Sequence, residues 1–259
     1  MQALYNNTAG TNNSATAVDA LRANTTGSLN TANGFQALYS NTTGWVNTSV
    51  GSNSLVSNTT GSYNTAVGYN TGPNTTNLDN TTCIGTDATA SASNMVRIGN
   101  FWVGSIGGQV GWTTLSDGRF KENVREDIPG LAFINQLRPV SYEINREKVN
   151  DFAGVNKRNS TESANSNNSV DYKIKPLSAT TTGFIAQEVE AAAKNIGFEF
   201  SGVDAPKNES DMYGLRYAEF VVPLVKAVQE LAQQNEQLKA ENARLEERLA
   251  AVENKLSGR

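Results

Sequence analysis

The chain has 259 residues, 18% of them charged, and a formal net charge of −4. This length allows one large domain or two smaller ones. The slight acidity gives no electrostatic footprint for nucleic acid or an anionic membrane. No apolar run approaches the roughly 18 residues of a membrane span, and the N-terminus lacks the features of a signal peptide. We therefore expect no nucleic-acid partner and no membrane insertion.

The chain has no histidine and a single cysteine, Cys83. An intrachain disulfide framework is therefore excluded, and a zinc site is not expected. Any serine nucleophile would need a base other than histidine, and a lysine can serve when its ammonium is desolvated. We expect no metal and no cofactor, and stability that comes from packing and oligomerisation.

The first part of the chain repeats a polar motif every 17 residues. The motif is Asn-Thr-Thr-Gly or a close variant, and a leucine keeps the same period. Because Asn, Thr, Ser and Gly favour turns and strands over helix interiors, the period predicts stacked β repeats over residues 1–73. The motif occurs at 7–10, 24–27, 41–44 and 58–61, and the leucines are Leu4, Leu21, Leu38 and Leu55.

Each repeat has too few apolar residues to form a core alone, and two arrangements stay open. The repeats could stack along one chain, or three chains could wrap together. We interpret the Asn-Thr-Thr-Gly corners as turns, in which glycine is able to take a positive φ. Triplets that match glycosylation sequons, such as 24–26, recur in register, so we interpret them as turn chemistry as well.

The texture of these repeats, Asn-Thr-Ala-x-Gly with x-Ala-Leu, resembles the head repeats of trimeric adhesins and the shafts of phage-type tail fibres. The resemblance favours a structural spacer, and the alternative is a surface that binds a host receptor or glycan.

Residues 74–115 lose the period. Alternating segments at 80–85 and 94–99, followed by a close-packed strand and turn at 101–108, predict a β neck there.

Residues 116–215 have the mixed pattern of a small α+β domain. Apolar residues share one helical face before Arg138–Pro139, where the residue preceding proline is pushed out of the helical region. The expected pieces are a helix at 131–137, a strand at 140–144, a mobile insertion at 150–170, a strand and helix at 183–194, and a strand at 213–217.

Four blocks of sequence follow one another in this region: Ser116-Asp117-x-Arg119-Phe120-Lys121-Glu122-Asn123-Val124, then 131–142, 183–189 and 213–217. In text and in order they resemble the endosialidase-type intramolecular chaperone domain at the C-termini of phage tail spikes and fibres. The resemblance covers about residues 112–259.

In that family the domain trimerises the fibre, helps it to fold and then cuts itself off just before a serine. The resemblance implies that Ser116 is the nucleophile, Lys121 its base, and Leu115–Ser116 the bond that is cleaved. A neutral lysine can take the hydroxyl proton while the hydroxyl attacks the adjacent carbonyl of Leu115. An oxyanion donor is also needed, and the sequence does not identify it. Gly118 stands where this block usually carries a larger residue.

Spacing alone favours another interpretation, in which Ser116 caps a turn and Lys121 is solvated. Glu188 and Glu190 are two residues apart and do not share a helical face, so we interpret them as surface or buttressing charges. A hydrolase that acts on other substrates has little support, because nothing else resembles a catalytic cluster.

Residues 216–259 keep a 3-4 apolar spacing for about five heptads, which is typical of a coiled coil. Pro223 fits the first turn of this helix. Asn235 and Asn242 at a positions lean toward a parallel dimer, but the family resemblance and the repeats indicate a trimer, which we predict. A membrane-surface helix is disfavoured because the opposite face is mixed in sign. The predicted trimer core consists of Leu224, Val228, Leu231, Asn235, Leu238, Asn242, Leu245, Leu249 and Val252.

Together the patterns predict the C-terminal part of a homotrimeric, β-rich tail-fibre-like protein on a virion tail, an extracellular contractile apparatus or a bacterial surface. It would be a single-turnover, self-cleaving serine peptidase with no external substrate. The competing hypothesis is a permanent structural or adhesive trimer with an inactive processing site. The predicted parts are β repeats at 1–73, a β neck at 74–115, an α+β chaperone domain at 116–215 and a coiled-coil helix at 216–259.

Overall fold

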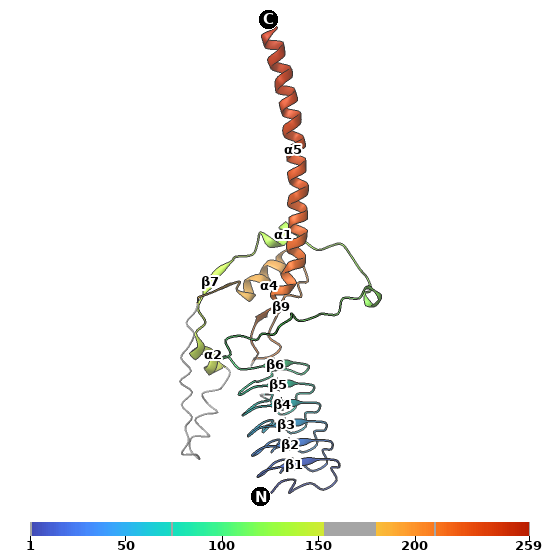
Figure 1. Cartoon of the computed structure of the whole chain (residues 1–259), viewed down its shortest axis with the longest axis vertical. Helices are drawn as coiled ribbons and strands as arrows, with labels where there is room; N and C mark the ends of the chain where they lie inside the picture. The colour runs from blue at the N-terminus through green and yellow to red at the C-terminus, as the bar shows by residue number, and fades with distance from the viewer. Residues whose placement is uncertain (1, 74, 153–179, 210, 259) are drawn as a thin grey trace. The chain divides into compact units, whose positions relative to one another are not determined.

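The computed structural model describes residues 2–73, 75–152, 180–209 and 211–258 (Figure 1). The chain divides into two compact units. One contains residues up to 111 together with segments 144–179 and 206–211, and the other contains 112–143, 180–205 and 212–259. The expected insertion at 150–170 falls mostly outside the described residues, after the short helix α2 (Arg146–Phe152).

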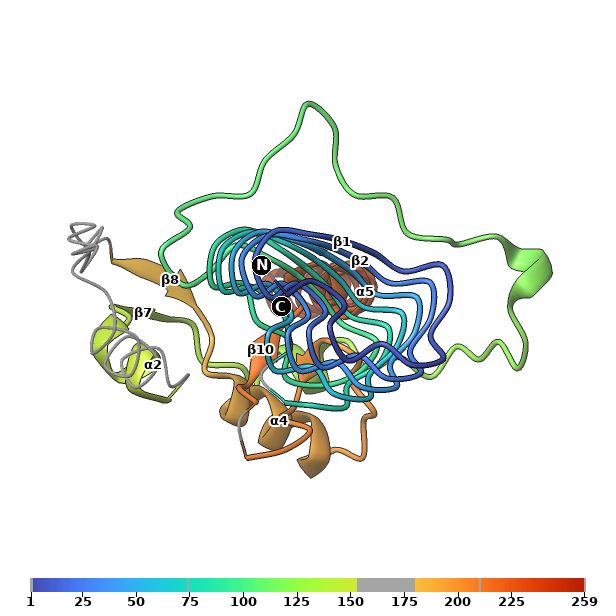
Figure 2. The ribbon, with the colours of Figure 1, turned by 90° about the horizontal axis from the view of Figure 1, so that it is seen from below.

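The first unit is a β-solenoid with one six-stranded parallel sheet, in which each strand pairs with the next along the chain. Thr31, Thr48 and Thr65 pair in register, so one 17-residue coil returns the chain to the same position. Figure 2 shows the coils lying over one another. The repeats therefore stack along a single chain. The strands are β1 (Ser14–Thr16), β2 (Thr31–Asn33), β3 (Thr48–Val50), β4 (Thr65–Val67), β5 (Thr82–Ile84) and β6 (Val96–Ile98).

The sheet continues past residue 73, because β5 and β6 extend it with the same parallel pairing. Thr82 pairs with Val96, so the last coil is 14 residues long. Beyond β6, the strand expected at 101–108 is not formed, and residues 103–116 have no regular element. Val110 and Trp112 are 86% and 88% exposed.

The solenoid core is thin, because one side chain from the middle of each strand points inward. Ala32, Ala66 and Cys83 are almost completely buried, and burial raises the pKa of the Cys83 thiol. Leu21 follows β1 and Leu38 follows β2 at the equivalent position of the next coil, and both are fully buried. The 17-residue leucine period therefore marks the core, as expected for repeats that stack.

Asparagine ladders run through the interior and satisfy its polar groups from coil to coil. Asn41 Nδ2 donates to Asn24 Oδ1 at 2.8 Å, and Asn58 Nδ2 donates to Asn41 Oδ1 at 2.9 Å. Each amide also donates to the carbonyl of the corner glycine three residues on, as Asn41 does to Gly44 at 3.0 Å. A second ladder joins Asn13, Asn30, Asn47, Asn64 and Thr81.

The corner glycines do not use the positive φ that their lack of a side chain would allow. Gly27 and Gly44 do not lie in that region, which is occupied instead by Leu21 and Leu38 at φ 51° and 52°. The corner glycines are needed for close approach: a Cβ on Gly44 would lie 2.3 Å from the carbonyl oxygen of Gly61 in the next coil. The leucines sustain a left-handed backbone that costs on the order of 1 kcal/mol each, because their side chains complete the core.

The second unit is a small α+β region followed by a long helix, as predicted for the fold class. Two short antiparallel pairs, β7 with β8 and β9 with β10, flank the helices. Its elements are η1 (Gly118–Phe120), α1 (Leu131–Ile134), β7 (Val140–Tyr142), β8 (Thr181–Gly183), α4 (Ala186–Asn195), β9 (Val203–Asp204), β10 (Gly214–Leu215), η2 (Tyr217–Phe220) and α5 (Val221–Ser257).

An aromatic cluster forms the core of this unit. The ring of Phe133 lies 5.3 Å from that of Phe198 and 4.9 Å from that of Phe200, and Phe200 lies 4.8 Å from Phe220 at the start of α5. The residues that pack around this centre include Val189 on α4. The apolar face of α4 and the base of α5 therefore share one core.

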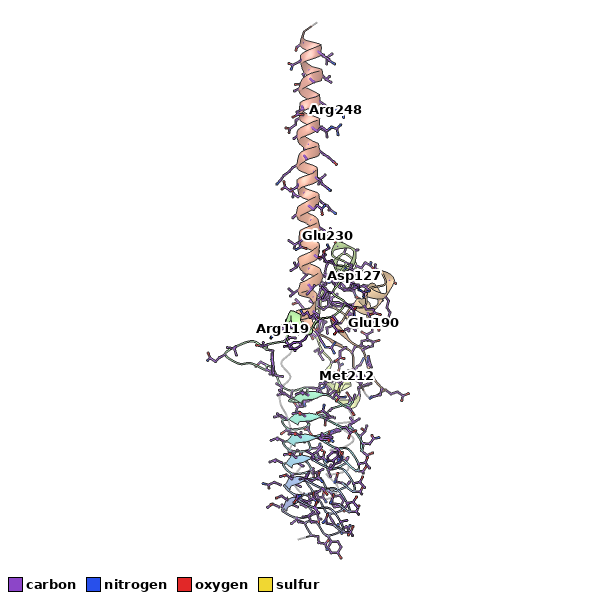
Figure 3. All side chains as sticks on the ribbon, turned by 90° about the vertical axis from the view of Figure 1, so that its right-hand side faces the viewer. Arg119, Asp127, Glu190, Met212, Glu230 and Arg248 are labelled. Atoms are coloured by element: carbon purple, nitrogen blue, oxygen red, sulfur yellow. The ribbon has the colours of Figure 1, made fainter. Side chains whose placement is uncertain are left out.

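Helix α5 is joined to α1 by a hydrogen bond as well as by packing. Glu230 on α5, labelled in Figure 3, accepts from the backbone N–H of Leu131 at 2.7 Å, which satisfies one donor at the start of α1. Gly130 allows this approach, since a Cβ there would lie 2.7 Å from the backbone nitrogen of Ala227. The face of α5 that bears Ala227 and Glu230 is thus the one used within the chain.

Candidate functional site

The segment around Ser116 is shaped by a tight turn that Asp117 nucleates. Asp117 Oδ1 accepts from the backbone N–H of Arg119 at 2.9 Å, and the Arg119 guanidinium pairs with the same carboxylate at 2.6 Å. These hydrogen bonds hold the pKa of the Asp117 carboxyl below its usual value, the side chain of Arg119 contributing most. The Lys121 N–H donates to Gly118 O at 3.2 Å and closes the turn.

The turn brings the two predicted catalytic side chains together. Lys121 Nζ donates to Ser116 Oγ at 2.8 Å. This distance is within the range at which a base can take a hydroxyl proton. The Leu115 carbonyl belongs to the residue before Ser116, so nucleophile, candidate base and target bond occupy one short segment.

Ser116 and Lys121 are exposed in the single chain. A lysine acts as a base only after its ammonium loses a proton, and removal from water favours that loss. The same segment also presents large apolar side chains to solvent: Leu115 is 78% exposed, Phe120 69% and Val124 78%. Exposed apolar residues in a row are typical of a surface that another molecule covers.

The predicted trimer core lies on a face of α5 that the described part of the chain leaves exposed. Leu231 is 52% exposed, Leu238 59% and Leu245 56%. The two polar positions in this stripe, Asn235 and Asn242, are exposed as well. The rest of the stripe is Leu224, Val228, Leu249 and Val252, each between 45% and 63% exposed.

Glu188 and Glu190 buttress the fold, which confirms their interpretation as structural charges. Glu188 forms a two-pronged ion pair with Arg138, including Nε to Oε2 at 3.0 Å. Glu190 accepts from Lys194 at 2.7 Å and from the hydroxyl of Tyr213 at 3.0 Å. These partners lower the pKa of both carboxyl groups, as expected for anions that are held as anions.

The sequence did not reveal one contact that shapes the site and one that holds the fold. The Asp117–Arg119 pair builds the turn, and an Asp before a Gly-Arg step is a recognisable capping signal. The bond from Glu230 to α1 spans 99 residues and has no local signal. Within the described residues, no group of three His, Cys, Asp or Glu side chains could hold a metal ion, and none of the helices is long and apolar enough to span a membrane.

The fold defines a β-solenoid that leads through an irregular connection to a small α+β region and a long helix, an architecture consistent with tail-fibre-like β repeats. Residues 116–198 match the model of the family described as the chaperone of endosialidase. The match begins at Ser116 and confirms the resemblance found in the sequence. No curated protein and no solved structure matches the chain.

This match supports an intramolecular chaperone role in a tail-fibre-like protein. The matched family also suggests homotrimeric assembly and implies a phage tail-fibre context. Helix α5 and the segment 206–211 follow the matched residues.

Proposed function

We propose that residues 116–259 form an intramolecular chaperone that trimerises the fibre through α5, assists the folding of the repeats and then releases itself by cutting Leu115–Ser116. Ser116 is the nucleophile and Lys121 its base. The contact that carries the proposal is the 2.8 Å hydrogen bond between Lys121 Nζ and Ser116 Oγ, beside the bond to be cut. The protein would belong to a virion tail, an extracellular contractile apparatus or a bacterial surface.

The chemistry balances within this segment. Neutral Lys121 takes the hydroxyl proton, Ser116 Oγ adds to the carbonyl carbon of Leu115, and the amide nitrogen of Ser116 leaves with a proton. The resulting ester is then hydrolysed by water, which gives a carboxylate at Leu115 and a new N-terminus at Ser116. Because nucleophile and carbonyl belong to adjacent residues, the proximity contribution is built into the chain.

Assembly would switch this chemistry on. The apolar side chains of Leu115, Phe120 and Val124 are exposed in one chain, and neighbouring chains of a trimer would cover them. Covering the segment would also remove water from Lys121 and favour its neutral form. Cleavage would then follow trimerisation.

Trimerisation through α5 would also let the helix associate before the solenoid coils have stacked. Parallel strands in successive coils pair residues 17 apart, whereas an α-helix forms from more local contacts, four residues apart, and is expected to form first. Three α5 helices that associate early would hold three chains together while the coils stack. Cutting at Leu115 then makes assembly irreversible, because the product has lost the module that formed it.

The test is the mass of freshly expressed chain beside Ser116→Ala and Lys121→Ala, with Lys239→Ala as control. Lys239 is an exposed lysine that pairs with Glu236 at 2.8 Å on α5. We expect wild type and the control to yield a fragment that begins at Ser116, and the other two variants to stay at full length. If all four chains stay whole, the proposed cleavage is wrong.

The second candidate is a permanent adhesive trimer with an inactive processing site. The observation that favours it is the solvent exposure of both Ser116 and Lys121. In that case the solenoid would do the binding. Trp45 and Tyr63, whose rings meet edge to face at 4.7 Å, are 45% and 49% exposed and would offer aromatic faces to a receptor or glycan.

A further inference from the structure

A short segment late in the sequence lies against the last coil of the solenoid. It consists of Pro206, Lys207, Asn208, Glu209 and Asp211, and we call it the 206–211 clamp. Ser91, in the loop between β5 and β6, donates from Oγ to Asp211 Oδ1 at 2.7 Å. Asn208 Nδ2 donates in return to the carbonyl oxygen of Ser91, also at 2.7 Å. Both hydrogen bonds lie within the first unit.

The clamp is preorganised around the carboxylate of Asp211. The backbone N–H of Lys207 donates to Asp211 Oδ2 at 3.1 Å, and the Asp211 N–H donates to Asn208 O at the same distance. Asp211 is only 8% exposed and Ser91 only 9%. A buried carboxylate is costly unless donors satisfy it, and here each oxygen has one. Separating Ser91 from Asp211 would remove one of the donors that hold this buried carboxylate.

The clamp joins residues that lie on either side of Leu115–Ser116 in the sequence. Ser91 precedes Leu115–Ser116, whereas Asn208 and Asp211 follow it. The two hydrogen bonds thus join segments that would end up in different fragments after a cut between residues 104 and 116. The covalent connection itself is exposed, and a Cβ added at Gly104 or Gly107 would meet nothing within 4 Å.

We propose that the 206–211 clamp is a docking element for the last solenoid coil and keeps residues 116–259 bound to the solenoid after the connecting segment has been cut. Solenoid ends need a cover, because a terminal coil has no neighbour on one side. The clamp attaches next to the final, 14-residue coil, which ends the sheet. Its opening is therefore a separate step that follows cutting and controls release.

The test uses the full chain and does not depend on self-cleavage. A site-specific protease sequence is inserted after Gly107 in the Ser116→Ala chain, which is then purified whole, cut and passed over a size-exclusion column. We expect the two fragments to elute together. Asp211→Ala removes the acceptor of both donors, and we expect it to raise the rate at which the fragments separate by about tenfold or more.

Two further variants keep the result interpretable. Glu209→Ala removes an exposed acid of the same segment and should leave the separation rate unchanged. Ser91→Ala should accelerate separation, and combining it with Asp211→Ala should add little, because the two residues share one bond. The circular dichroism of each uncut chain checks that the solenoid is folded. The proposal is overturned if the fragments of the unmodified clamp separate at once, or if Asp211→Ala separates no faster than Glu209→Ala.

Discussion

The solenoid and the unit that contains α5 treat their side chains in opposite ways. In the solenoid even asparagines are buried, and Asn41 bonds to Asn24 in the coil before it and accepts from Asn58 in the coil after it. Along α5, by contrast, leucines such as Leu231 and Leu238 stay more than half exposed. Stacked repeats thus complete one another from coil to coil, whereas α5 has an apolar face that no other described residue of the chain covers.

The most severe test of this difference is to place a charge in the α5 stripe. In Leu238→Asp a trimer would bury three carboxylates in one layer, and unpaired buried charges are strongly destabilising. Tested in the Ser116→Ala chain, which should stay uncut, the change is expected to abolish the trimer, so that sedimentation gives 27.7 kDa instead of three times that mass. Hydrogen exchange of the solenoid coils should change little.

Ala240→Asp is the matched control, because position 240 lies outside the 3-4 stripe. It should remain trimeric. A trimer that survives Leu238→Asp would show that the stripe is not the interface, and a dimer in the unmodified chain would favour the role of Asn235 and Asn242 as dimer-specifying residues.

Glycines in the two regions differ in how much space surrounds them. A Cβ on Gly44 would meet Gly61 O at 2.3 Å and Asn41 Oδ1 at 2.4 Å, so Gly44→Ala must push two coils apart. We expect a loss of about 3 kcal/mol in the free energy of unfolding of the solenoid. Gly118 lies in open space, and Gly118→Ala should change stability by less than about 1 kcal/mol. Urea midpoints of both variants provide the measurement, and equal midpoints would contradict the close-packing argument.

The periodicity of the sequence was enough to predict stacked repeats, because each coil repeats the same local contacts. It did not reveal that the asparagines are buried, since Asn is mostly an exposed residue and only the partner in the next coil makes burial tolerable. Nor did it place the left-handed backbone at Leu21 and Leu38. That choice follows from the core geometry, which outweighs the preference of leucine for negative φ.

Around the candidate site, the sequence predicted which residues are involved better than how they are held. The family resemblance predicts Ser116 and Lys121 as nucleophile and base. The structure adds the Asp117 turn that sets the distance between their side chains. The strand expected at 101–108 is absent, and residues such as Ile106 stay 59% exposed because no other described part of the chain covers them. The hydrogen bond between Ser91 and Asp211 joins residues 120 apart in the sequence, and no local sequence pattern predicts it.

A smaller effect on the rate of self-cleavage is expected from the ion pair between Asp117 and Arg119 in the turn at Ser116. Hydrogen bonds from Arg119 lower the pKa of the Asp117 carboxyl in the folded turn. A lowered pKa means that the turn gains stability above the ordinary pKa of aspartate, about 3.9, and loses it as the pH falls through the lower folded value. Asp117→Asn keeps the cap but removes the ion pair, and we expect self-cleavage at neutral pH to slow by about threefold.

Asp127→Asn is the matched control for that variant. Asp127 pairs with Arg125 at 3.2 Å, which is also an exposed pair two residues apart, but it lies outside the turn. Its cleavage rate, measured by intact mass over time, should equal that of the parent chain. Equal slowing of both variants would mean that general charge, and not the turn, controls the rate.

The last expected effect is a gain in stability at the end of the asparagine ladder. Thr75 stands one period after Asn58, and within the described residues neither Asn58 Oδ1 nor Thr75 Oγ1 has a hydrogen-bond partner. Thr75→Asn would supply an amide to Asn58 Oδ1 and should raise the free energy of unfolding by about 1 kcal/mol. Thr75→Val, which removes the hydroxyl and leaves Asn58 unpaired, separates the two contributions. If the valine variant is as stable in urea as the asparagine variant, the ladder is not the source of the gain, and the solenoid would depend less on its buried amides than the comparison with α5 implies.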